Sequence, residues 1–149
     1  ASLGSLLADE EVSLTRGGFI FPAPVSHLLT RSSFVWATIL DIACSIVKNY
    51  RILAAAAGHT PDYIWACGGG LQSGVLRQLI ANLTGKKVQM RKEYQQSSAV
   101  GGALICNEAL QVNIPPDESM EVIHPADTEY YNTLYAEWER TRRYFREMN

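Results

Sequence analysis

Apolar residues recur at helical spacing in three long stretches of the chain. A stripe with spacings of three and four residues predicts one amphipathic helix over 32–57, with Gly58 as its C-terminal stop. A second helix is predicted over 74–84, and Gly85 follows it. The terminal stretch 126–148 predicts a last helix, whose apolar side carries Tyr131, Leu134, Tyr135, Trp138 and Tyr144.

Shorter runs of bulky residues predict strands. "YIWAC" (63–67) has the length and bulk of a buried strand, and "KVQMR" (87–91) alternates like an edge strand. "GGFIF" (17–21) is a third candidate, stopped by Pro22 because proline cannot donate into a sheet ladder.

The stretch "SSAVGGALICNEAL" predicts a further helix, with Ser97 or Ser98 as its N-cap. Small residues fill its first turns. Gly101 and Gly102 are interpreted as positions of close packing between helix and sheet rather than as binding residues.

Helices that alternate with strands through short connections predict an α/β domain, in which loops at strand ends commonly form the ligand site. Residues 1–16 are expected to form a loop-like lead-in and 17–149 one domain. Within that domain, 113–125 is expected to be a loop because it is rich in turn-forming residues.

Three consecutive glycines, 68–70, lie between the strand 63–67 and the helix that follows. The dinucleotide fingerprint G-x-G-x-x-G fails at its third glycine, where the chain has Ser73. The Walker loop fails at its phosphate-binding lysine, where the chain has Val75. Two interpretations remain: a tight turn that only lets helix and strand pack closely, or a flat shelf that accepts a planar group such as adenine, with Gln72 and Ser73 beside it.

Composition excludes several classes of function. The 149 residues are 47% hydrophobic with a formal net charge of -2, which predicts one soluble globular domain without the basic surface that nucleic acids require. No apolar run approaches the ~20 residues of a membrane span. The three cysteines and three histidines are scattered, which predicts no metal site and favours a reduced cytoplasm.

"GGGLQSGVLRQLIANLTGKKVQM", followed by "SSAVGGALICNEAL", resembles the C-terminal domain of the FGGY family of carbohydrate kinases. "RGGFIFPAPVSHLLTRSSFVWATILDIACSIVKNYRIL" upstream is similar to the same family, so the resemblance covers roughly 16–112. It implies the C-terminal part of a ribonuclease H-like, actin-like ATPase domain, with a mixed sheet flanked by helices. It also implies an ATP-dependent kinase of a sugar or polyol, with Mg²⁺ held mainly through the phosphates and by another part of the protein.

The resemblance places Gly68, Gly69 and Gly70 under the adenine, with Ser73 near its exocyclic amine and Gln72 beside it. It assigns no catalytic residue to this chain, because the family's catalytic aspartate and phosphate-binding threonine loop lie in a preceding region. The chain is therefore interpreted as a C-terminal piece of a kinase, inactive alone and prone to form homo-oligomers. The alternative is a non-enzymatic nucleotide-binding or assembly module of the actin-like ATPase superfamily.

The chain departs from the family pattern at Leu76, Asn82 and Gln96. Asp41, inside the first helix, is expected to have a structural role. The basic run "ERTRRYFRE" is interpreted as a solvated helix face, in which Glu139 pairs with Arg142 or Arg143, rather than as a phosphate site.

Overall fold

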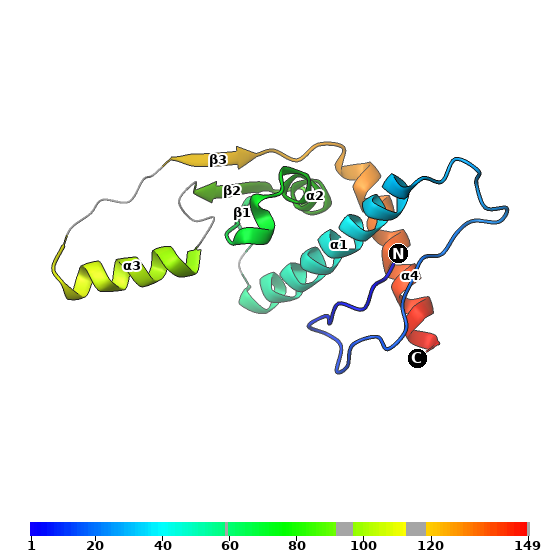
Figure 1. The fold of residues 1–149 in the computed structure, drawn as a ribbon, viewed down its shortest axis with the longest axis horizontal. Helices are drawn as coiled ribbons and strands as arrows, with labels where there is room; N and C mark the ends of the chain where they lie inside the picture. Colours follow the sequence, from blue (N-terminus) through cyan, green and yellow to red (C-terminus); the bar gives the residue numbers. More distant parts are fainter. Residues whose placement is uncertain (59, 92–96, 113–118, 149) are drawn as a thin grey trace. The chain divides into compact units, whose positions relative to one another are not determined.

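A computed structural model describes residues 1–58, 60–91, 97–112 and 119–148 (Figure 1). The chain forms two compact units. Unit 1 joins Ala1–Thr60 to Asp127–Asn149, and unit 2 consists of Pro61–Ala126.

The long first helix of unit 1, α1, spans Arg31–Ala57. Its start is supported by Ser33, whose hydroxyl accepts a hydrogen bond from the Thr30 amide at 3.2 Å. It ends at Gly58, which has the left-handed conformation with a φ of 62°. The helix and its glycine stop predicted from the apolar stripe are thus confirmed to within one residue.

Helix α4, Thr128–Glu147, packs beside α1 in unit 1. Its buried side chains lie three, four and three residues apart, as one face of a helix requires: Tyr135, Trp138, Arg142 and Phe145. Tyr144 was expected on the apolar side and is instead 52% exposed. The 3.6-residue period places Phe145, not Tyr144, in line with Trp138.

Asp41 of α1 connects three segments of unit 1. Its side chain is 1% exposed. It accepts a hydrogen bond from the Trp138 indole N–H at 2.6 Å and one from the Leu3 amide at 2.9 Å. A buried carboxylate needs such donors to offset its lost hydration, so the predicted structural role of Asp41 agrees with its contacts.

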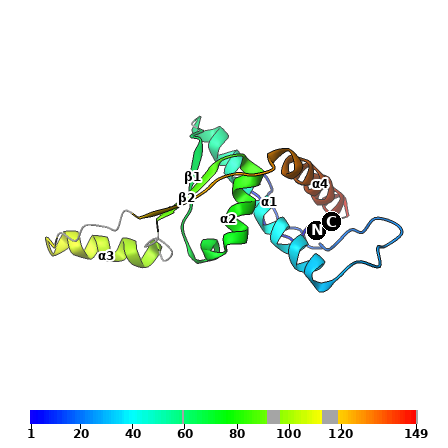
Figure 2. The same ribbon diagram turned by 90° about the horizontal axis from the view of Figure 1, so that it is seen from above.

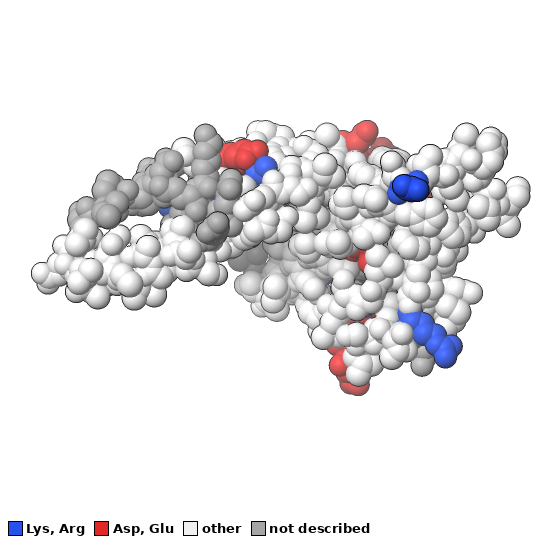
Figure 3. Space-filling view, in the orientation of Figure 1, with Lys and Arg blue, Asp and Glu red and all other residues white. Residues whose placement is uncertain are grey.

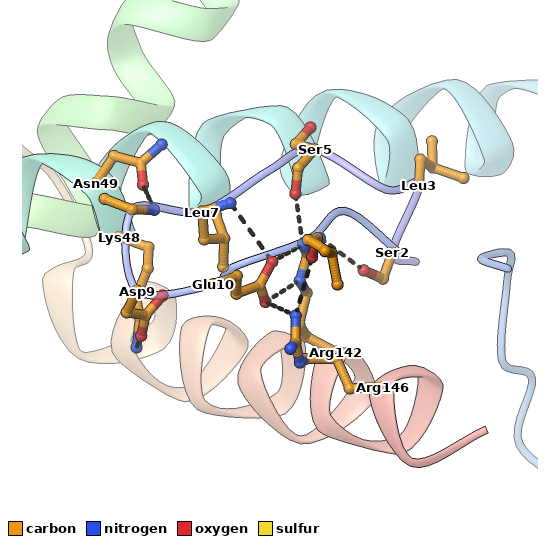
Figure 4. A network of polar contacts seen from close by, with 12 residues as sticks. Ser2, Leu3, Ser5, Leu7, Asp9, Glu10, Lys48, Asn49, Arg142 and Arg146 are labelled. Carbon is orange, nitrogen blue, oxygen red and sulfur yellow. Dashed lines mark hydrogen bonds and ion pairs between the residues drawn. The ribbon is translucent and has the colours of Figure 1, made fainter. Parts of the chain in front are cut away.

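A charged cluster ties the first ten residues to α4 (Figure 4). The Glu10 carboxylate accepts hydrogen bonds from Arg142 Nε at 3.0 Å and Nη2 at 2.5 Å. Both side chains are buried, at 7% and 4% exposed. Arg142 also donates to the Ser2 hydroxyl and to the Ser5 carbonyl. The expectation of a solvated Arg142 was wrong, because its partner lies in the N-terminal segment rather than one turn away.

The environment of Glu10 has opposing effects on its carboxyl pKa. Burial alone would raise this pKa, but the hydrogen bond and the charge of Arg142 together bring it below the ordinary value. The amide of Leu7 and the charge of Arg146 lower it further. Glu10 therefore favours the folded state as a carboxylate, and its contribution is lost as the pH falls through its lowered pKa.

The strand expected over 17–21 is not formed. Gly18 makes only an isolated antiparallel bridge to Ser2, with backbone hydrogen bonds of 2.8 and 3.0 Å. The run is too short, and too close to Pro22, to extend this bridge into a ladder.

Unit 2 is built on a three-stranded mixed sheet of order β1-β2-β3 (Figures 1 and 2). β1 (Tyr63–Trp65) pairs with β2 (Lys87–Arg91) in parallel, and β2 pairs with β3 (Met120–Ile123) antiparallel. Strand β2 is therefore central, not the edge strand that its alternation suggested.

Strand β3 lies in the stretch 113–125 that was expected to be a loop. In "MEVI" only the first three residues alternate between apolar and polar, and turn-forming residues precede them, so the strand signal is weak. Residues 113–118 lie outside the described part of the chain.

The sheet has two different faces. Side chains of Val88 and Met90 lie on one face and are 1% exposed. Helix α2, Gly74–Thr84, covers this face, and its Arg77 contacts Glu121 of β3 at 2.6 Å. The opposite face, defined by Tyr63, Trp65, Gln89, Arg91, Met120 and Val122, is here named the open sheet face. Helix α3 (Ser97–Ala109) has no buried residue.

The buried ion pair between Glu10 and Arg142 gives a testable prediction. We expect Arg142→Met to lower the free energy of unfolding by roughly 3 kcal/mol, because it leaves the Glu10 carboxylate buried without its main partner. Arg146→Met is the matched control: Arg146 also contacts Glu10, at 3.2 Å, but is 39% exposed. Its loss should cost under about 1 kcal/mol. Equal losses in the two variants, measured by urea unfolding, would contradict this assignment.

Candidate functional site

The glycine segment begins where β1 ends. The Ala66 amide donates to the Gln89 carbonyl at 2.8 Å, which continues the pairing of β1 with β2 beyond Trp65. Gly68 then turns the chain with a φ of 96° and a ψ of 159°, a conformation that L side chains rarely adopt. The first glycine of the triplet is therefore required by the backbone itself.

Beyond Gly68 the chain forms a short 3-10 turn, Gly69–Gln72, and then enters α2. The turn is closed by the Leu71 amide, which donates to the Gly68 carbonyl at 3.1 Å. Ser73 is the N-cap of α2, and its hydroxyl accepts a hydrogen bond from the Leu76 amide at 3.4 Å. This arrangement fixes the glycines between two regular elements of unit 2.

The space over the three glycines is open. A Cβ atom added at Gly68, Gly69 or Gly70 would have no neighbour within 4 Å. Close packing of a helix on a strand would place such a neighbour there, so the described chain offers no packing reason for the second and third glycines. Gln72 and Ser73 are exposed beside them, and the Gln72 amide has no hydrogen-bond partner among the described residues.

A cavity of about 420 Å³ adjoins the first glycine on the open sheet face. Its described lining residues are Trp65, Ala66, Cys67 and Arg91. The Arg91 guanidinium lies 5.7 Å from the centre of the Trp65 ring. The sequence analysis did not single out this pair, although the period-two alternation of β1 and β2 could have placed both side chains on one face.

Asn82, one of the departures from the family pattern, has a structural role in this unit. Its amide oxygen accepts hydrogen bonds from Gln78 Nε2 at 2.8 Å and from the Ala126 amide at 2.9 Å. Leu76 is half-buried in α2, and Gln96 lies outside the described residues. The two hydrogen bonds of Asn82 connect the C-terminal half of α2 to the segment after β3.

Other residues considered from the sequence do not join this site. Trp138 is buried beside Asp41, and Trp36 belongs to α1 in unit 1. Gly101 and Gly102 were expected to pack closely on the sheet, but a Cβ at either would meet nothing within 4 Å.

Neither a basic patch nor a metal-binding cluster marks the site on the face drawn in Figure 3 or among the described residues. The face drawn in Figure 3 shows scattered basic and acidic side chains and no continuous basic patch. No group of three or more His, Cys, Asp or Glu residues is placed to hold a metal ion within the ranges described. None of the helices in those ranges has the length and hydropathy of a membrane span.

Comparisons with known proteins agree on one family. Residues 13–110 match the family described as "FGGY family of carbohydrate kinases, C-terminal domain". The chain is 46% identical over 145 residues to a protein of Bacillus subtilis (strain 168) named "Putative sugar kinase YoaC". That match covers 97% of this chain and 30% of the relative, so the chain spans about a third of the relative's length.

Solved structures give the same assignment. A ligand-bound xylulose kinase from Lactobacillus acidophilus matches with a TM-score of 0.60 and 26% identity, over 77% of this chain and 26% of that protein. A gluconate kinase from the same organism matches with a TM-score of 0.59 and 26% identity, over 77% and 25%. These matches confirm the α/β, actin-like ATPase fold with a mixed sheet.

The cap at Ser73 gives a prediction that does not depend on any ligand. We expect Ser73→Ala to lower the free energy of unfolding by about 1 kcal/mol, because the Leu76 amide loses its acceptor. Ser73→Asn should have little effect, since asparagine caps helices as well as serine does. Thermal unfolding of both variants tests this, and equal stability of the two would contradict the capping role.

Proposed function

We propose, because the chain belongs to the FGGY family of carbohydrate kinases, that it supplies the ATP-binding C-terminal part of a sugar or polyol kinase. Such a kinase transfers the γ-phosphoryl group of ATP to a hydroxyl of its substrate. The chain spans only 25–30% of the relatives compared, so this activity is proposed for a longer protein that contains it.

The open space over Gly68, Gly69 and Gly70 is the observation that carries the proposal. Only Gly68 has a positive φ that favours glycine. At Gly69 and Gly70 the absence of a side chain instead leaves room for a planar group at van der Waals distance from the backbone. We assign the adenine of ATP to this shelf. Gln72 lies at its edge, and its side-chain amide has no hydrogen-bond partner among the described residues. Ser73 offers a second polar side chain, although its hydroxyl also caps α2.

The residues of this chain would bind and orient the nucleotide rather than carry out the chemistry. Phosphoryl transfer needs a base near the attacking hydroxyl and cations near the phosphates. We propose that both come from outside this chain, with Mg²⁺ held mainly through the phosphate oxygens. Magnesium, when bound, would neutralise the charge that develops on the transferred group.

We also propose that the kinase works in the cytoplasm. Its three cysteines are free thiols, as a reducing compartment favours: Cys44, Cys67 and Cys106. Self-association of this chain is proposed as well, because large apolar side chains such as Leu53 and Trp65 are more than half exposed.

The adenine shelf can be tested at Gly70. Because Gly70 does not have a positive φ and has open space around it, Gly70→Val should fold normally. Its isopropyl group would occupy the position of the ring. We expect ATP affinity in the intact kinase to fall at least about tenfold, roughly 1.4 kcal/mol, by calorimetric titration.

Gly101→Val is the matched control, because Gly101 also has open space but lies in α3. It should leave ATP affinity unchanged, and neither variant should change sugar binding. An unaltered ATP affinity in folded Gly70→Val protein would reject the adenine assignment.

The proposal that this chain binds the nucleotide while the base and cations come from elsewhere gives a second prediction. The 149-residue chain alone should produce no ADP above background with ATP, Mg²⁺ and a panel of pentoses, hexoses and polyols. The reason is that, under this proposal, the base and the cations for the transfer come from outside the chain. Sustained sugar-dependent ADP release, measured by a coupled assay, would place the catalytic groups within this chain.

A further inference from the structure

We propose that Gln72 recognises the 6-position of the purine ring, and that it accepts a 6-oxo group as well as the 6-amino group of adenine. The intact kinase would then bind inosine triphosphate (ITP) as well as ATP. This inference rests on the proposed function, because it takes the base to lie on the shelf beside Gly69 and Gly70. It follows from the geometry of the turn, the capping role of Ser73 and the amide of Gln72.

Gln72 and Gly69 lie on the same side of the turn that follows β1. The turn Gly69–Gln72 is a 3-10 helix with about three residues per turn, so positions three residues apart are eclipsed. A Cβ atom at Gly69 would meet nothing within 4 Å, so this side of the turn is open. The rise from Gly69 to Gln72 is about 6 Å. A planar ring that covers Gly69 therefore has the Gln72 side chain at its edge rather than beneath it.

The Gln72 amide is available to a ligand. Between Gly68 and Leu76 the polar side chains are those of Gln72 and Ser73. Gln72 is exposed, and its amide has no hydrogen-bond partner among the residues described. A glutamine amide has a carbonyl that accepts and an NH2 group that donates. Both ends of this amide are thus free to bond to the edge of a base.

The Ser73 hydroxyl is already used at the start of α2. It accepts a hydrogen bond from the Leu76 amide at 3.4 Å, and this amide is one of those that the first turn of a helix leaves without a carbonyl partner. An amino group of a base would compete with Leu76 for the same oxygen. The family resemblance places Ser73 at the exocyclic amine, but the cap gives that role to Gln72.

An amide that is not held in one orientation can bond to either kind of group. The Gln72 carbonyl would accept a hydrogen bond from the 6-amino group of adenine. After a half-turn of the amide, its NH2 group would donate to the 6-oxo group of hypoxanthine, the base of ITP. Strict discrimination requires that the wrong ligand leave a polar group of the site unpaired. At Gln72 both bases find a partner, whereas a purine with only hydrogen at position 6 finds none.

Three nucleotides that differ at position 6 test this inference in the intact kinase. ATP has an amino group there, ITP has an oxo group, and purine riboside triphosphate has only hydrogen. We expect calorimetric titration to give ATP and ITP affinities within about twofold of each other, since each makes one hydrogen bond to Gln72. Purine riboside triphosphate should bind about fivefold more weakly than either, the contribution of one neutral hydrogen bond.

Two variants assign this difference to a residue. Gln72→Leu should remove it, so that all three nucleotides bind with equal affinity, because leucine has a similar size but no polar group. Ser73→Ala is the comparison variant and should keep the roughly fivefold difference. Persistence of the difference in Gln72→Leu, or its loss in Ser73→Ala, would overturn the assignment to Gln72. A preference of the unaltered kinase for ATP over ITP of about tenfold or more would overturn the acceptance of the oxo group.

The Gly70→Val variant separates this inference from the function on which it rests. If Gly70→Val weakens the binding of all three nucleotides while Gln72→Leu leaves their affinity ratios unchanged, the adenine shelf stands and the role of Gln72 is rejected. If Gly70→Val leaves all three affinities unaltered, the adenine assignment is rejected, and this inference with it.

Discussion

The conformation of Gly68 is the constraint on which unit 2 depends. Strand β1 is held to β2 up to the hydrogen bond from Ala66 to Gln89, and α2 starts only seven residues later at its Ser73 cap. A turn with a positive φ lets the chain change direction in that space. The direction of α2 is set by this turn, and with it the cover of the buried sheet face. The space beside Gly69 and Gly70 is open, and it is there that we propose the adenine binds.

Unit 1 is held together by two buried polar contacts of different kinds. The Asp41 carboxylate accepts hydrogen bonds from the Trp138 indole N–H and the Leu3 amide, which are far apart in the sequence. The Glu10 carboxylate accepts hydrogen bonds from the Arg142 guanidinium. In each case a carboxylate is buried together with its donors, which offsets the cost of removing its charge from water. These contacts tie the N-terminal segment, which has no helix and one isolated bridge, to α1 and α4.

Local periodicity predicted the elements whose stabilising contacts are local. The bounds of α1, α2 and β2 follow from apolar spacing and glycine stops, and the fold class follows from their order. Elements and side chains whose state is decided by a distant partner do not follow from local spacing. Arg142 is three residues from Glu139, which suggested a surface pair, but it is buried against Glu10. The glycine triplet was found from its sequence, whereas the open space over it could be seen only once α2 had been placed.

The pairing of Glu10 with Arg142 has a consequence for how the protein is made. The two residues are 132 positions apart. At a synthesis rate of about 5–20 residues per second, Glu10 leaves the ribosome roughly 7–26 s before its partner. Asp41 is likewise synthesised before its partner Trp138, which lies 97 positions later in the chain. Helix α1 therefore lacks its α4 partner until these later residues have been made, while unit 2 lies wholly between the two partners. Unit 1 can close only after its last helix has emerged, because it joins segments from the two ends of the described chain.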